Sequence, residues 1–147
     1  MDKDLIARSS IVINAPVDLV WKALVDPDAI RQYMFGTQVV SNWKVGSPII
    51  WKGEWQGKLY EDKGVILQFQ PERTLQYSHF SPLSGMPDQP ENYHTVIVEL
   101  SPEGNQTKVV LAQDHNASEE ERAHSEKNWE GMLAALKKFV EGEIRRT

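Results

Sequence analysis

The stretch SEEERAHSEKNWEGMLAALKKFVEG, residues 118–142, predicts a long helix that ends the chain. Ser118 and Glu121 have the spacing of a capping box, in which the serine accepts from a free backbone N–H and the glutamate bonds back. Three glutamates in the first turn, and Lys137 and Lys138 near the end, suit the two poles of the helix dipole. We therefore expect the helix to begin after Ser118 and to end near Gly142.

Apolar residues occur at helical spacing only in the second half of this helix. They are Trp129, Met132, Leu133, Leu136 and Val140. On the same face, the first half carries Arg122, Ser125 and Glu126, which are not ordinary core residues. A helix with this division is expected to lie over a cavity that is closed at the apolar end and open at the polar end.

The composition is that of one ordinary folded domain of 147 residues, with 40% hydrophobic and 25% charged residues. The chain has no cysteine, which excludes disulfides and thiolate metal sites. A net charge of -5 without a basic run argues against nucleic acid as a partner. No apolar run approaches the roughly 18 residues of a membrane span, and the N-terminus lacks a signal-peptide pattern. A cytoplasmic protein with no membrane insertion is the expectation.

The rest of the chain predicts one strand, two short helices and then about six strands. Residues 5–14 are rich in β-branched side chains, typical of a strand. Pro16 and the pair Asp26-Pro27 each mark a helix start. The later strand candidates are 37–43, 48–54, 57–70 with a break at Gly64, 73–80, 92–100 and 106–115.

Short connections without intervening helices predict antiparallel hairpins in this region. One connection, residues 81–91, is longer than a hairpin needs, which indicates a lid or a mobile segment. The face of the sheet that must be buried has one large element available to cover it, the C-terminal helix. The predicted fold is therefore α+β, with a curved antiparallel sheet wrapped on that helix.

Residues 14–27, NAPVDLVWKALVDP, resemble the opening motif of the SRPBCC (START-type, helix-grip) superfamily. More narrowly, they are similar to proteins related to the C-terminal domain of the heat-shock-protein-90 ATPase activator. The resemblance extends over residues 9–141 through Val45-Gly46, Gly64, Pro71-Glu72-Arg73, residues 107–111, and Trp129 followed by Leu133 and Leu136. The chain departs from the pattern at Tyr33, Ser47 and Asn128.

The resemblance implies a single domain with a deep hydrophobic pocket between sheet and helix. Members of the superfamily bind lipids, polyketides or other apolar molecules, and some are cyclases or similar enzymes. It supplies no agreed catalytic motif, so the catalytic residues stay unknown. It also implies a third possibility, a stress-response protein that associates with a chaperone.

Strand alternation predicts a polar rim for this pocket. If the apolar parity of residues 73–115 faces inward, several polar side chains gather at one end of the covered face. These rim residues are Tyr77, His79, His94, Gln113 and His115. The predicted depths are lined by Trp21, Met34, Trp51, Trp55, Trp129, Met132 and Leu133. Large aromatic residues also fill cores, and for the tryptophans we favour that interpretation over a ligand wall.

The histidines have three interpretations: rim residues, metal ligands or a general base. No compact metal motif such as HxH is present, so we expect no metal and no cofactor. Asp114 and His115 are adjacent in a strand and are expected to point to opposite faces. His79 would need a carboxylate from elsewhere, such as a distant glutamate.

The sequence thus predicts a protein that binds a small hydrophobic or amphipathic molecule between the sheet and the C-terminal helix. The first alternative is an enzyme of the cyclase or hydrolase kind that acts on an apolar substrate in the same cavity. The second is the chaperone-associated protein. The oligomeric state stays open, a homodimer included.

Overall fold

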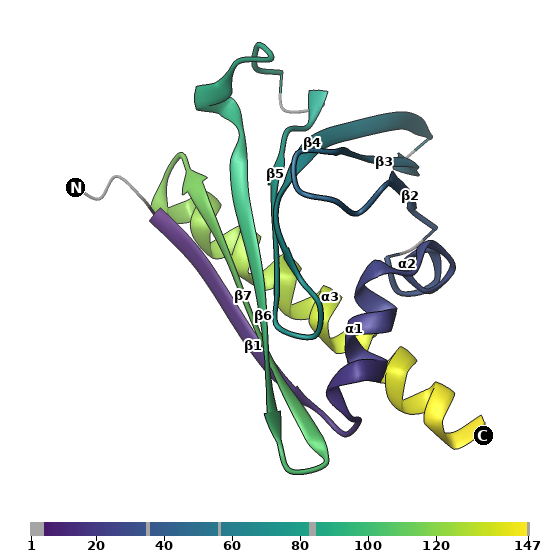
Figure 1. Cartoon of the computed structure of the whole chain (residues 1–147). Helices are drawn as coiled ribbons and strands as arrows, with labels where there is room; N and C mark the ends of the chain where they lie inside the picture. Colours follow the sequence, from purple (N-terminus) through teal and green to yellow (C-terminus); the bar gives the residue numbers. More distant parts are fainter. Residues whose placement is uncertain (1–4, 35, 56, 83–84, 147) are drawn as a thin grey trace.

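The computed structural model describes residues 5–34, 36–55, 57–82 and 85–146. Within these ranges the chain forms a curved seven-stranded sheet and a long C-terminal helix that crosses one face of it (Figure 1). The elements are β1 (Leu5–Ile13), α1 (Val17–Val25), α2 (Pro27–Tyr33), β2 (Gln38–Ser41), β3 (Pro48–Trp55), β4 (Lys58–Gln70), β5 (Thr74–His79), the 3₁₀ turn η2 (Pro90–Asn92), β6 (His94–Glu103), β7 (Gln106–Asn116) and α3 (Glu119–Arg146). The predicted α+β class, the antiparallel sheet and the two short helices after the first strand are confirmed.

The sheet has the strand order β1-β7-β6-β5-β4-β3-β2, and all neighbours are antiparallel. Alternate residues of the strands face α3, as period-two patterning requires. The core between them includes the fully buried Ile66, Val96 and Leu111 from the sheet, and Leu133 and Leu136 from α3. The apolar half of α3 therefore covers the core, as its sequence predicts.

The side chains of α3 cover the free edge of β1. Glu126 Oε1 accepts from Arg8 N at 3.1 Å, and Glu141 Oε2 accepts from Asn14 N at 2.8 Å. Lys137 Nζ donates to Val12 O at 2.9 Å. These bonds satisfy backbone groups that would otherwise be open to pairing with another strand. They fix α3 along the sheet edge.

Asp26 separates the two short helices and starts the second. Its carboxylate accepts from Asp28 N at 3.1 Å, and Pro27 occupies the first turn, where no N–H is needed. Both helices lie beside the C-terminal part of α3 (Figure 1). The first helix begins at Val17, one residue later than Pro16. None of the described helices is long and apolar enough to cross a membrane.

The predicted break at Gly64 is wrong, because β4 continues through it. Up to Val65 the strand pairs with β3, and from Ile66 it pairs with β5. Gly64 lies at this crossover, where a Cβ atom would stand 1.7 Å from the carbonyl oxygen of Ser78. The glycine therefore allows β4 and β5 to approach closely and does not mark a turn of the chain.

The long connection before β6 is attached to the sheet through Asp88. Its carboxylate pairs with Lys63 of β4 and accepts from the Tyr93 hydroxyl at 2.6 Å. Asn92 Nδ2 adds a bond to Pro87 O at 2.8 Å. The connection is thus attached to the sheet at Asp88, and its role as a lid or a mobile segment stays a prediction.

The start of α3 agrees with the prediction. Ser118 Oγ accepts from Glu121 N at 3.1 Å, which is the serine half of the capping box. The helix continues to Arg146, beyond the predicted end at Gly142.

Candidate functional site

A cleft and a small inner cavity lie between the sheet and α3. The cleft has a volume of about 330 Å³ and opens to solvent. The inner cavity has a volume of about 40 Å³. Met34, Trp129 and Met132 line both spaces, so these three side chains form the wall where cleft and cavity meet. We call them the shared wall.

The two spaces differ in chemistry. The cleft has a mostly polar lining outside the shared wall: Thr37, Glu54, Tyr60, Gln113, Ser125 and Asn128. The cavity is lined by aliphatic and aromatic residues, the aromatic ones being Tyr33, Trp43, Trp51, Tyr77 and Trp129. This is the arrangement of many small-molecule sites, with an apolar interior and a few polar groups near the entrance.

Trp129 is held in the shared wall by a hydrogen bond from α3 to the sheet. Its indole Nε1 donates to Gln113 Oε1 on β7 at 2.6 Å. Gln113 is buried and lies opposite Val96 of β6. The bond satisfies a buried amide oxygen and fixes the orientation of the indole ring.

Two tyrosines of the cavity differ in their hydrogen bonding. The Tyr33 hydroxyl donates to Ala23 O at 2.9 Å. Tyr77 packs its ring 5.1 Å from that of Trp51, and its hydroxyl makes no hydrogen bond to the described residues. Burial raises the pKa of both phenols, so both stay protonated at neutral pH.

The polar residues of the cleft are largely paired with one another or with the adjoining sheet. Thr37 Oγ1 and the Tyr60 hydroxyl are 2.8 Å apart. Ser125 Oγ donates to Asn116 Oδ1 at 3.0 Å. Glu54 is the one charged side chain among the described residues of the lining.

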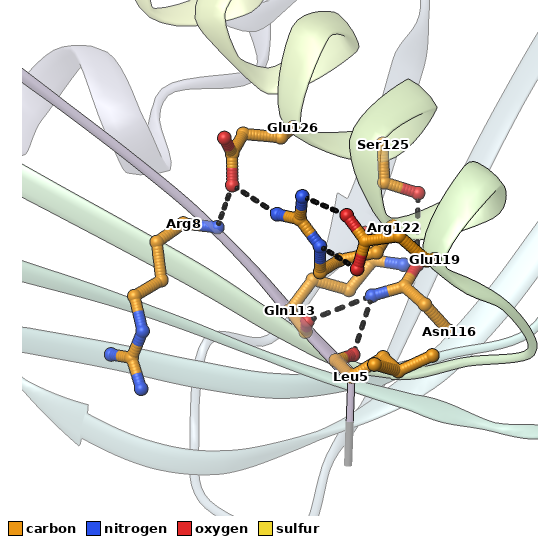
Figure 2. A network of polar contacts seen from close by, with 8 residues as sticks. All are labelled: Leu5, Arg8, Gln113, Asn116, Glu119, Arg122, Ser125 and Glu126. Atoms are coloured by element: carbon orange, nitrogen blue, oxygen red, sulfur yellow. Dashed lines mark hydrogen bonds and ion pairs between the residues drawn. The ribbon is translucent and has the colours of Figure 1, made fainter.

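The polar face at the start of α3 forms a network with β1 and β7 (Figure 2). Arg122 pairs with Glu119 at 2.5 Å and with Glu126 at 2.8 Å, which holds the pKa of Glu119 below its usual range. Asn116 Nδ2 donates to Leu5 O at 2.9 Å. The polar face, Arg122, Ser125 and Glu126, is predicted from the sequence to lie at the mouth of a cavity. Of these three residues Ser125 lines the cleft, Glu126 attaches the helix to β1, and Arg122 pairs within α3 with Glu119 and Glu126.

The three predicted rim histidines lie in a different pocket. His79, His94 and His115 line a space of about 630 Å³ together with the connection before β6 and the start of α3. His79 and His94 are paired in register across β5 and β6, with ring centroids 6.3 Å apart. The three histidines therefore lie together, as strand alternation predicts, but in a pocket separate from the cleft.

Each of these histidines contacts an aspartate residue. His79 Nε2 is 2.9 Å from Asp62 Oδ2, and His94 Nδ1 donates to the Asp114 carbonyl at 2.9 Å. The prediction that Asp114 and His115 point apart is wrong, because His115 has a φ of 59° and its Nδ1 lies 3.4 Å from Asp114 Oδ1. Asp62 was missed, although it has the same inward parity on β4 as the buried Ile66.

Two further predicted site residues, Trp21 and Leu133, are not in the lining of the cleft or the cavity. Trp21 is in the core, with its ring 5.3 Å from that of Phe69. Leu133 is buried beneath α3. The side chain of Trp55 lies outside the described residues. Thr37, Glu54, Tyr60 and Asn128 were not predicted, because they come from loops, from a hairpin and from the exposed side of α3. Within the described ranges no group of three or more His, Cys, Asp or Glu could hold a metal ion.

A seven-stranded antiparallel sheet closed by a C-terminal helix, with a pocket between them, defines a protein of the helix-grip class. A family model described as "Activator of Hsp90 ATPase homolog 1-like protein" matches residues 14–141. The chain belongs to this family. No curated protein matches the chain.

Solved structures show the same fold. The solution structure of ChR145 from Cytophaga hutchinsonii has 58% sequence identity and a TM-score of 0.83, covering 95% of this chain and 96% of that one. CalU16 from Micromonospora echinospora has 28% identity and a TM-score of 0.67, covering 96% and 78%. The Aha1 dimer from Colwellia psychrerythraea has 21% identity and a TM-score of 0.70, covering 92% and 95%.

Proposed function

We propose that this protein binds a small hydrophobic or amphipathic molecule in the cleft and cavity between the sheet and α3. The observation that carries the proposal is the shared wall of Met34, Trp129 and Met132 between an open cleft and an apolar cavity. Methionine side chains are flexible, so a ligand can displace them and join the two spaces. Burial of its apolar surface supplies the affinity, at about 25 cal/mol per Å².

Membership of the family supports this proposal, because the fold commonly binds hydrophobic ligands in the same place. The aromatic residues of the cavity support it as well. Rings such as those of Trp51 and Trp129 give a ligand a large contact area with few internal rotations.

A tryptophan placed at position 128 tests the site. Asn128 is exposed on α3 and lines the cleft, whereas Glu130, two residues later, is exposed and does not line it. We expect Asn128→Trp to fill the cleft and to weaken binding at least tenfold, equivalent to about 1.4 kcal/mol. Glu130→Trp is the matched control and should bind normally. Thermal melting of both variants should show unchanged stability.

Native mass spectrometry of the three proteins, purified gently from the organism's own cells, measures the effect. The expected result is a bound small molecule on the wild type and on Glu130→Trp that is depleted from Asn128→Trp. Identification of the molecule released on denaturation then gives its class. Equal loading of both variants would place the ligand elsewhere and contradict the proposal.

A second candidate function, an enzyme of the cyclase or hydrolase kind, is favoured by the contact between His79 and Asp62. A carboxylate that holds one imidazole nitrogen leaves the other as a general base. The His79 ring also lies 5.0 Å from the ring of Trp51, which lines the cavity. In an activity screen with apolar esters, His79→Gln and Asp62→Asn should both lose turnover and keep ligand binding. Turnover that survives both changes would remove this candidate.

A further inference from the structure

The two tyrosine hydroxyl groups of the inner cavity differ in their hydrogen bonding. Tyr33 and Tyr77 both line it, and both are buried. The Tyr33 hydroxyl is bonded to Ala23 O, whereas that of Tyr77, a residue only 9% exposed, has no partner in the part of the chain that the structure describes. Native proteins pair nearly all such groups, with protein, water or ligand. The Tyr77 hydroxyl is therefore free to bond to a water or ligand group that enters the cavity.

The polar side chains of the cleft are weaker candidates than Tyr77 for a hydrogen bond to the ligand. Thr37 is already paired with Tyr60, and Gln113 with Trp129, whereas the exposed Asn128 amide faces solvent. A polar group on a ligand gains more by reaching Tyr77 than by breaking one of these pairs, because an exchange of one bond for another yields little.

The charges of the residues around the two spaces restrict the chemical class of the ligand's polar group. Among the residues that the structure describes, no charged side chain lines the cavity, and one, Glu54, lines the cleft. A carboxylate would leave water without meeting a cation and would be repelled by Glu54. The phenol of Tyr77 remains a proton donor, because burial raises its pKa. The neighbouring Trp51 also has only a donor, its indole N–H. Such surroundings suit a neutral hydrogen-bond acceptor.

We propose that the ligand is a neutral carbonyl compound that accepts a hydrogen bond from the Tyr77 hydroxyl. This inference rests on the binding function proposed above. The carbonyl enters the cavity, and the hydrocarbon chain lies in the cleft along Trp129. A space of about 40 Å³ admits a group of a few atoms, since roughly 10–15 Å³ already holds a water molecule. Ketones, aldehydes and esters fit this description, whereas fatty acids do not.

Three probes of equal length separate these classes: 2-octanone, octanoate and 2-methyl-1-octene, in which a CH₂ group replaces the carbonyl oxygen. Affinities are measured on the full chain by backbone amide NMR shifts at the cleft. For the wild type we expect the ketone to bind about threefold to tenfold more tightly than the alkene, which is the range for one neutral hydrogen bond. Octanoate should bind most weakly. In Tyr77→Phe the ketone should fall to the affinity of the alkene, whose own binding is unchanged.

Tyr33→Phe is the matched control, because it removes the other hydroxyl of the same cavity. It should lower the melting temperature by leaving Ala23 O unpaired, and it should keep the preference for the ketone. Tyr77→Phe should leave the melting temperature unchanged or raise it, since no protein bond is lost. Equal binding of ketone and alkene by the wild type, or tightest binding of octanoate, would overturn this inference and leave the proposed function intact. Failure of all three probes to shift cleft residues would contradict both.

Discussion

Replacing Gly64 with alanine should lower the free energy of unfolding by about 3 kcal/mol or more. The new methyl carbon would stand 1.7 Å from Ser78 O and 2.6 Å from Ser78 C. Both are backbone atoms, so β4 and β5 must separate at the point where β4 passes from β3 to β5. For a chain of this size the melting temperature should fall by roughly 6–12 °C.

Gly131→Ala is the control for that experiment. Gly131 is exposed within α3, and nothing lies within 4 Å of its prospective Cβ. Alanine should stabilise the helix by about 1 kcal/mol, so the same substitution has opposite signs at the two sites. Urea unfolding measures both. A Gly64→Ala protein as stable as the wild type would show that the two strands do not approach this closely.

Trp129→Ala should weaken both folding and ligand binding. It removes a half-buried indole from the shared wall and leaves the buried Gln113 Oε1 without its donor. Fully buried tryptophans cost about 3–5 kcal/mol on truncation, so we expect roughly 2–3 kcal/mol here. Loss of the wall also joins cleft and cavity into one open space, which reduces the area a ligand buries.

Two further variants separate the contributions of Trp129. Trp129→Phe keeps most of the ring surface but loses the N–H, and should recover more than half of the lost stability. Lys127→Ala, at an exposed position on the same helix, should change neither property. Urea unfolding and 2-octanone titration provide the two measurements. Unchanged stability together with unchanged affinity in Trp129→Ala would contradict the role of the shared wall.

The elements of the fold could be predicted because their signals are local. The Ser118 cap, the Asp26-Pro27 start and the apolar stripe of α3 each depend on residues within one or two helical turns. The misplaced break at Gly64 has the opposite cause. A glycine in a strand pattern signals either a turn or close approach, and only the position of Ser78, on another strand, decides between them.

The candidate site was predicted only in part, because its geometry depends on how distant segments meet. Alternation gave His79 and His94 a common face, and β5–β6 register confirmed it. Strand alternation shows which face a side chain is on but not how far it lies from the mouth of the pocket. Tyr77 was therefore predicted at the rim, whereas it lines the inner cavity. The left-handed backbone at His115 likewise turned a side chain that a regular strand would direct elsewhere.

Periodicity, capping residues and turn residues were thus sufficient for the helix-grip fold, since each strand or helix reports its own buried face. The division of the polar residues among a cleft, a cavity and a separate histidine pocket came only from the packed chain. It depends on contacts such as Trp129–Gln113 and His79–Asp62, which join residues 16 or 17 positions apart. Such contacts are set by register and crossing geometry, and those are properties of the whole sheet and helix together.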